Sequence, residues 1–117
     1  MRLPNNLRCL LVQDADLEKS AACLQVNVGN LHDPPHAQGL AHFLEHMLFL
    51  GTRKFPEENH YSKLVQGNGG QKNAATGEDY TYYYFDVKEG TFPEAVDVFS
   101  QFFKEPLFTE AATEREM

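Results

Sequence analysis

Cysteine is scarce in this chain, and long apolar runs are absent. Only Cys9 and Cys23 occur among 117 residues, too few for a disulfide framework and too far apart for a cysteine-type zinc site. Both fall in expected strands, so we expect buried or half-buried free thiols. No run approaches the ~20 apolar residues of a membrane-spanning helix, and no basic-then-apolar leader stands at the start. These absences lead us to expect a cytoplasmic location and no membrane partner.

Positive charge is also in short supply. The chain has ten lysines and arginines and 17 acidic residues, which gives a formal net charge of −7. This charge argues against nucleic acid as a partner. The run Tyr82-Tyr83-Tyr84 has no basic groove to accompany base stacking, so alternating burial in a sheet explains it better. Hydrophobic residues make up 42% of the chain, enough to fold. The length allows one domain, residues 1–117, with a modest core.

One mostly apolar segment carries polar side chains at a regular spacing. Between Gly39 and Gly51 the chain reads His42-Phe43-Leu44-Glu45-His46, which is His-x-x-Glu-His, the inverted form of the zinc-protease motif. On a helix the two histidines are one turn apart on one face, with the glutamate beside them. At about 100° per residue, the opposite face would be buried and would contain Leu40, Leu44, Met47 and Leu48.

The three motif residues favour metal-dependent hydrolysis. Two neutral imidazoles can bind one metal ion, while a neighbouring carboxylate lies beside the water that the metal carries. The alternative is a buried helix whose histidines are satisfied by hydrogen bonds to their neighbours. That alternative would have to satisfy three polar groups in one place on an otherwise apolar helix.

The rest of the chain alternates between strand and helix patterns. Strands are expected at residues 7–13, 21–28, 71–75 and 80–87, from alternating or apolar runs bounded by turn residues. Helices are expected from Pro56 to Gly67, from a Thr91-x-x-Glu94 capping box up to Pro106, and after Thr109. Gly69-Gly70 marks a turn or a close backbone approach. This order fits an α+β fold with helices packed on one face of a mostly antiparallel sheet.

The motif helix and its surroundings resemble peptidase family M16, the inverzincins, and are most similar to its insulysin branch. Beyond residues 39–52, the likeness includes residues 33–35, 54–59, 69–70, 73–74, 83–87, 101–103, 106–108 and 115–116. It therefore covers nearly the whole chain. The resemblance implies the same α+β architecture and a zinc metalloendopeptidase acting on peptide substrates. It also implies that His42 and His46 bind Zn²⁺, and that Glu45 is the general base.

The resemblance further implies a ligand that these three residues do not supply. A catalytic zinc usually has three protein ligands, and the family's third is the second of two glutamates about two turns apart on a later helix. Glu116 matches the first, which supports the site without binding metal, and the second would lie past Met117. Glu110 and Glu114 remain open as substitutes. We therefore expect a C-terminally incomplete domain that functions with the remaining M16 domains or subunits.

The strand at residues 71–75 is the second functional candidate. Family members hold the substrate as an added strand along this edge, and Asn73 and Ala74 take that role by resemblance. From the residues alone, an ordinary edge strand beside a turn is the simpler interpretation. Three other histidines, His32, His36 and His60, are expected at the surface. A catalytically inactive fragment or a non-catalytic peptide-binding subunit, lacking the third zinc ligand, remains the alternative function.

Overall fold

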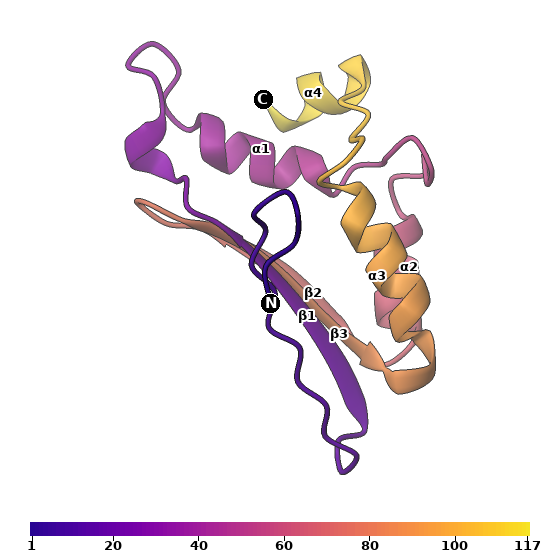
Figure 1. Ribbon diagram of the computed structural model, residues 1–117. Helices are drawn as coiled ribbons and strands as arrows, with labels where there is room; N and C mark the ends of the chain where they lie inside the picture. The colour runs from indigo at the N-terminus through magenta and orange to yellow at the C-terminus, as the bar shows by residue number, and fades with distance from the viewer.

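The computed structural model describes all 117 residues. Its helices cover one face of a three-stranded antiparallel sheet (Figure 1), which confirms the predicted α+β class. The sheet order is β1-β3-β2, with bounds β1 (Lys19–Val26), β2 (Gln71–Thr76) and β3 (Thr81–Lys88). The helices are α1 (Leu40–Leu48), α2 (His60–Gly67), α3 (Phe92–Gln101) and α4 (Glu110–Glu116), with short 3-10 turns η1 (Asn30–His32) and η2 (Glu89–Thr91). None of the helices has the length and apolar character that a membrane crossing requires.

The core lies between β3, the middle strand, and the helices on one face of the sheet. Alternate residues of β3 are buried, so Tyr83 is 3% exposed while Tyr84 is 40% exposed. This alternation confirms that the tyrosine run reflects sheet burial. Three helices complete the core by contributing Leu48 from α1, Tyr61 and Val65 from α2, and Ala95, Val98 and Phe99 from α3, with Phe102 directly after it.

Gly70 determines where β2 begins. A Cβ atom at this position would collide with the Asp86 carbonyl of β3, so the close approach of the two backbone segments requires glycine. From there the ladder runs from the pair Gln71↔Asp86 to the pair Thr76↔Thr81. The close approach predicted for Gly69-Gly70 is thereby confirmed. Because β2 is last in the sheet order, its other edge has no neighbouring strand.

The expectation of a strand at residues 7–13 is wrong. This segment makes only an isolated bridge, Arg2↔Arg8, and the side chains of Leu10, Leu11 and Val12 are 88%, 76% and 81% exposed. An apolar pattern becomes a strand only when a neighbouring strand takes its backbone hydrogen bonds. In this chain β1 pairs with β3 instead, and nothing pairs with residues 10–12.

Other expected details also need correction. The strand expected at residues 21–28 begins and ends two residues earlier, as β1. Cys9 is half-buried outside any strand, whereas Cys23 is exposed on the outer face of β1 and both thiols are free. Burial of Cys23 was therefore wrongly expected. The helix expected from Pro56 begins only at His60, after a turn.

The two predicted starts of the later helices have different outcomes. Thr91 makes no side-chain cap bond to α3, because η2 already winds the backbone and leads directly into the helix. The prediction of a capping box at Thr91 and Glu94 is therefore wrong. By contrast, the Thr109 hydroxyl accepts the Ala112 N–H at 3.3 Å and caps α4, so the helix expected after Thr109 is confirmed.

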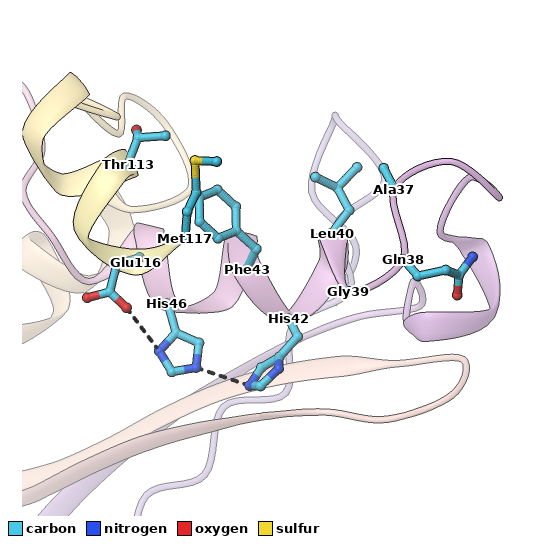
Figure 2. A pocket seen from close by; sticks show the side chains of 10 residues that line it. All are labelled: Ala37, Gln38, Gly39, Leu40, His42, Phe43, His46, Thr113, Glu116 and Met117. Atoms are coloured by element: carbon cyan, nitrogen blue, oxygen red, sulfur yellow. Dashed lines mark hydrogen bonds and ion pairs between the residues drawn. The ribbon is translucent and has the colours of Figure 1, made fainter.

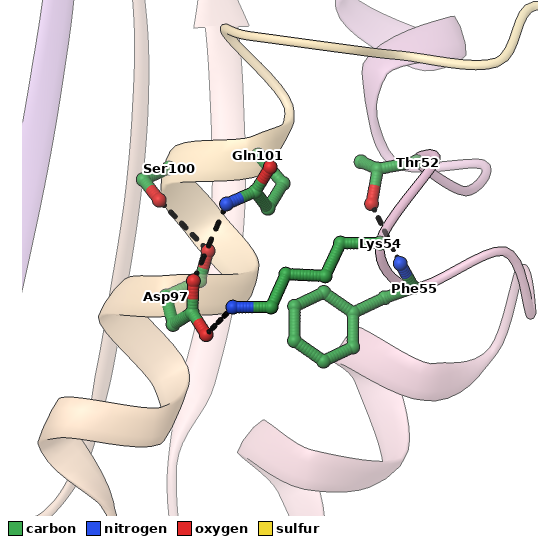
Figure 3. A network of polar contacts seen from close by, with 6 residues as sticks. All are labelled: Thr52, Lys54, Phe55, Asp97, Ser100 and Gln101. Atoms are coloured by element: carbon green, nitrogen blue, oxygen red, sulfur yellow. Dashed lines mark hydrogen bonds and ion pairs between the residues drawn. The ribbon is translucent and has the colours of Figure 1, made fainter.

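A polar network ties the loop after α1 to α3 (Figure 3). Lys54 Nζ lies 2.6 Å from Asp97 Oδ2, and Gln101 Nε2 donates to Asp97 Oδ1 at 3.3 Å. Within the loop, the Phe55 N–H donates to Thr52 Oγ1 at 3.1 Å. The hydrogen bond from the Lys54 ammonium is the main cause that holds the pKa of Asp97 below its usual value.

We predict that Asp97→Asn destabilises the protein only when the carboxyl would be ionised. Because the folded pKa is lowered, the stabilisation is full above the pKa of an unfolded aspartate, about 3.9, and is lost as the pH falls through the folded value. Thermal unfolding should show a small decrease in Tm at neutral pH and none well below pH ~3. Asp79→Asn, in the exposed β2–β3 turn, is the control. An equal decrease at both pH values would contradict the ion pair.

Candidate metal centre

Asp33 holds the N-terminus of α1 in place. Its carboxylate oxygens accept the N–H groups of Gly39 at 2.8 Å and Ala41 at 3.0 Å. A carboxylate there satisfies two otherwise unpaired donors and faces the positive end of the helix dipole. Gly39, with φ of 88°, lets the chain turn into the helix. This cap could not be found from local sequence because Asp33 precedes Gly39 by six residues and is not at the N-cap position.

The faces of α1 differ from the expectation in one respect. His42 and His46 are exposed and Glu45 is 8% exposed, while Met47 and Leu48 are buried at 2% and 6%. Leu40 and Leu44, expected to be buried, are 48% and 43% exposed. They line an apolar groove with a volume of about 540 Å³, because no element of the chain covers this part of the helix.

The motif residues converge on one point. The Nε2 atoms of His42 and His46 are 3.0 Å apart, and the ring planes cross at 61°. Figure 2 shows both rings pointing away from the helix, toward the β2–β3 hairpin. One ligand atom from each of His42, Glu45 and His46 lies within 4.8 Å of the others. The predicted grouping of the three side chains on one face is therefore present.

The donor set fits a zinc ion. Two imidazole nitrogens are ligands that zinc accepts, at Zn–N distances of about 2.0–2.1 Å, and the neighbouring carboxylate is suited to lie beside the water that the metal carries. Two nitrogens in a tetrahedral site would then be about 3.3 Å apart, close to the 3.0 Å between the two Nε2 atoms. Without a metal, two neutral rings can make this contact only if one Nε2 carries a proton and the other does not.

Glu116 approaches the other side of His46. Its Oε2 lies 3.7 Å from His46 Nδ1 (Figure 2), the nitrogen that does not face His42. A carboxylate at that position can orient the ring of a metal-binding histidine, so the site-supporting role of Glu116 stays a prediction that this placement suits. Glu116, Glu110 and Glu114 all lie outside the three-residue cluster. A cavity of about 590 Å³ lies beside His46 and Glu116, and its lining also includes His42, Phe43 and Met117.

Glu45 is held from the sheet side. The Thr76 hydroxyl, at the end of β2, donates a hydrogen bond to Glu45 Oε2. Tyr83 of β3 lies nearby: burial, and secondarily the Glu45 charge, raises the pKa of Tyr83 to about 12. Thr76 was not among the residues expected at the site. Strand alternation places Thr76 on one face of β2 with Lys72 and Ala74, but it does not identify what that face meets.

The two residues predicted to bind substrate lie on the edge strand. The Ala74 N–H donates to Asn73 Oδ1 at 2.8 Å, so it is not committed to β3. Backbone groups alternate between the two sides of an antiparallel strand, which directs those of Lys72 and Thr76 to the same unpaired edge. The edge is thus open to an added strand, while the substrate-binding role of Asn73 and Ala74 stays a prediction.

The remaining histidines are not part of the cluster. His32 Nδ1 accepts the Gly29 N–H at 3.0 Å, and His36 is exposed. His60 is half-buried, stacks on Phe55 with ring centroids 5.0 Å apart, and has a buried Nε2 without a partner. The surface position expected for His60 is therefore wrong, because Phe55 folds over it.

Comparisons with known proteins identify the family. The family description "Insulinase (Peptidase family M16)" matches residues 8–117, so the chain belongs to peptidase family M16. Over its whole length it is 48% identical to "Insulin-degrading enzyme" of Bos taurus, covering 12% of that relative. It is 51% identical to a protein of Caenorhabditis elegans named as a zinc protease, covering 14% of it.

A solved structure agrees with the fold. The crystal structure of pitrilysin matches 98% of this chain at 40% identity with a TM-score of 0.94, and the match spans 12% of the pitrilysin chain. The resemblance to family M16 and the α+β architecture are thereby confirmed. The chain nevertheless spans only about an eighth of the length of these relatives.

We predict that His42→Asn lowers the affinity for zinc at least ~100-fold, because it removes one of two converging imidazoles. Isothermal titration with ZnCl₂ measures the change. His36→Asn, which removes an exposed histidine outside the cluster, is the matched control and should bind as the parent does. Equal affinity of the His42 variant and the parent would show that zinc does not bind at α1.

Proposed function

We propose that this chain carries the zinc-binding and proton-transferring part of an M16 metalloendopeptidase. The observation that supports this most is the cluster of His42, Glu45 and His46, with ligand atoms within 4.8 Å of one another. The cluster adjoins β2, the strand that supplies the Thr76 contact to Glu45. The relative of Caenorhabditis elegans that is named as a zinc protease supports zinc as the metal.

Each side chain has a separate part in this reaction. A zinc ion, when bound, supplies a Lewis acid and an activated water at neutral pH. His42 and His46 would hold it through the two converging Nε2 atoms. Glu45 takes the proton of the attacking water and passes it to the leaving amine. Its Oε2 accepts a hydrogen bond from Thr76, and the carboxylate keeps further lone pairs to take the proton.

The unpaired edge of β2 is the proposed site for the peptide substrate. An extended peptide can add to a free edge through main-chain hydrogen bonds, which tolerate many sequences. The Ala74 N–H is the donor we assign to the substrate, and Asn73 Oδ1 now occupies it at 2.8 Å. Binding therefore requires the Asn73 amide to rotate away, after which it too can bond the peptide. The names of relatives such as the bovine insulin-degrading enzyme support a polypeptide substrate.

Further polypeptide is a necessary partner in this proposal. The apolar groove beside α1, about 540 Å³ in volume, and the exposed Leu10 and Leu11 side chains leave apolar surface in water, which is costly. The relatives are about eight times longer than the matched segment. We propose that the remaining M16 domains or subunits cover these surfaces and supply the third zinc ligand.

We predict that Glu45→Gln in the full-length protein keeps zinc but abolishes peptide cleavage. The amide preserves size and cannot accept the proton, so kcat should fall at least ~1,000-fold, the loss of an acid–base group. A fluorogenic peptide assay and zinc analysis by atomic absorption measure the two properties. Glu114→Gln, an exposed glutamate of α4 outside the cluster, should change neither. Retained cleavage in the Glu45 variant would exclude it as the base.

A second candidate is a fragment that binds metal or peptide without turnover. It is favoured by the cluster itself: with Glu45 assigned as the base, only two imidazoles remain as ligands, whereas a catalytic zinc usually has three protein ligands besides water. A dedicated non-catalytic subunit is less well supported, because all three motif residues are present.

We therefore predict that the 117-residue chain alone is inactive and binds zinc at least ~10-fold more weakly than the full-length protein. Parallel calorimetric titrations compare the two. Tight, stoichiometric zinc binding with peptide turnover by the short chain would overturn this prediction and make the chain a complete enzyme.

A further inference from the structure

One buried polar contact joins the motif helix to the edge strand. Glu45 is 8% exposed, and its Oε2 accepts a hydrogen bond from the hydroxyl of Thr76, the last residue of β2. A nearly buried carboxylate requires such a partner. Thr76 is half-buried and is separated from Glu45 by 31 positions in the sequence, so only the tertiary fold brings the two together.

The two sides of β2 have different neighbours. Side chains of alternate residues face the helices: Lys72 Nζ lies 5.0 Å from the centre of the Phe49 ring, and Thr76 reaches Glu45. The backbone groups of the same residues face the unpaired edge, together with those of Ala74. The strand that would receive the substrate therefore also contacts the proposed general base.

We propose that Thr76 is a positioning residue that fixes the Glu45 carboxylate relative to a peptide bound along β2. This inference rests on the proposed function. Glutamate has three rotatable side-chain bonds, and a displacement of about 1 Å at a reacting group can lower a rate ~100-fold. The hydrogen bond from the Thr76 hydroxyl to Oε2 restricts this freedom. The hydroxyl belongs to the strand that would bind the peptide. The Glu45 carboxylate and the peptide are therefore positioned by the same strand.

Three variants distinguish positioning from simple stability. Thr76→Val keeps the shape and removes the hydroxyl, and Thr76→Ser keeps the hydroxyl. Thr81→Val is the matched control, because Thr81 pairs with Thr76 in the ladder and is 5% exposed. Its hydroxyl donates instead to the Val28 carbonyl at 2.8 Å, away from Glu45.

In the full-length protein, Thr76→Val should lower kcat about 10- to 100-fold, with KM within about twofold and zinc affinity unchanged. Thr76→Ser should restore kcat to within ~3-fold of the parent. Thr81→Val should lower Tm but leave kcat near the parent value. The role of Thr76 is overturned if the valine variant keeps the parent kcat, or if serine fails to restore it.

A double-mutant cycle tests the contact without relying on cleavage. In the zinc-free protein, the decrease in Tm for the Thr76→Val and Glu45→Ala pair should be smaller than the sum of the single decreases, because both remove the same hydrogen bond. Thr81→Val and Glu45→Ala should be additive. Additivity of the Thr76 pair overturns the inference. If the parent protein cleaves no peptide, the proposed function is overturned instead. The mutant cycle measures the contact independently of that result.

Discussion

Docking of α1 against the β2–β3 hairpin is the constraint on which the rest of the site depends. Met47 and Leu48 anchor the helix in the core, Asp33 fixes its first turn, and Thr76 bonds Glu45 from the sheet. Together these contacts leave only one rotation of the helix about its axis. That rotation directs both imidazole rings toward the β2–β3 hairpin, in which β2 has an unpaired edge.

The site could be predicted where the information is local. The spacing of His42, Glu45 and His46 determines which face of a helix they share, and that face is the one that the structure assembles. The alternation in β3 likewise follows from its own residues. Thr76 and Asp33 could not be found in this way, because their contacts with α1 depend on how distant segments pack together. No local pattern identifies which threonine will meet Glu45.

Two of the wrong expectations share a physical cause. Residues 7–13 have the composition of a strand but no neighbouring strand, and Leu40 and Leu44 have the periodicity of a buried face but no element to cover them. A pattern in the sequence states what a segment can bury or pair with, and the rest of the fold decides whether a partner exists. In the proposed function, these uncovered surfaces are the ones assigned to additional M16 polypeptide.

The central claim, a zinc site built on α1 by two histidines, is tested most directly by zinc K-edge X-ray absorption of the zinc-loaded protein. Imidazole ligands produce characteristic multiple scattering from the outer ring atoms, which oxygen ligands do not. The account predicts this signal in the parent and its reduction in the His42→Asn variant. A parent spectrum with oxygen ligands alone, or one that the His42 substitution leaves unchanged, would contradict it.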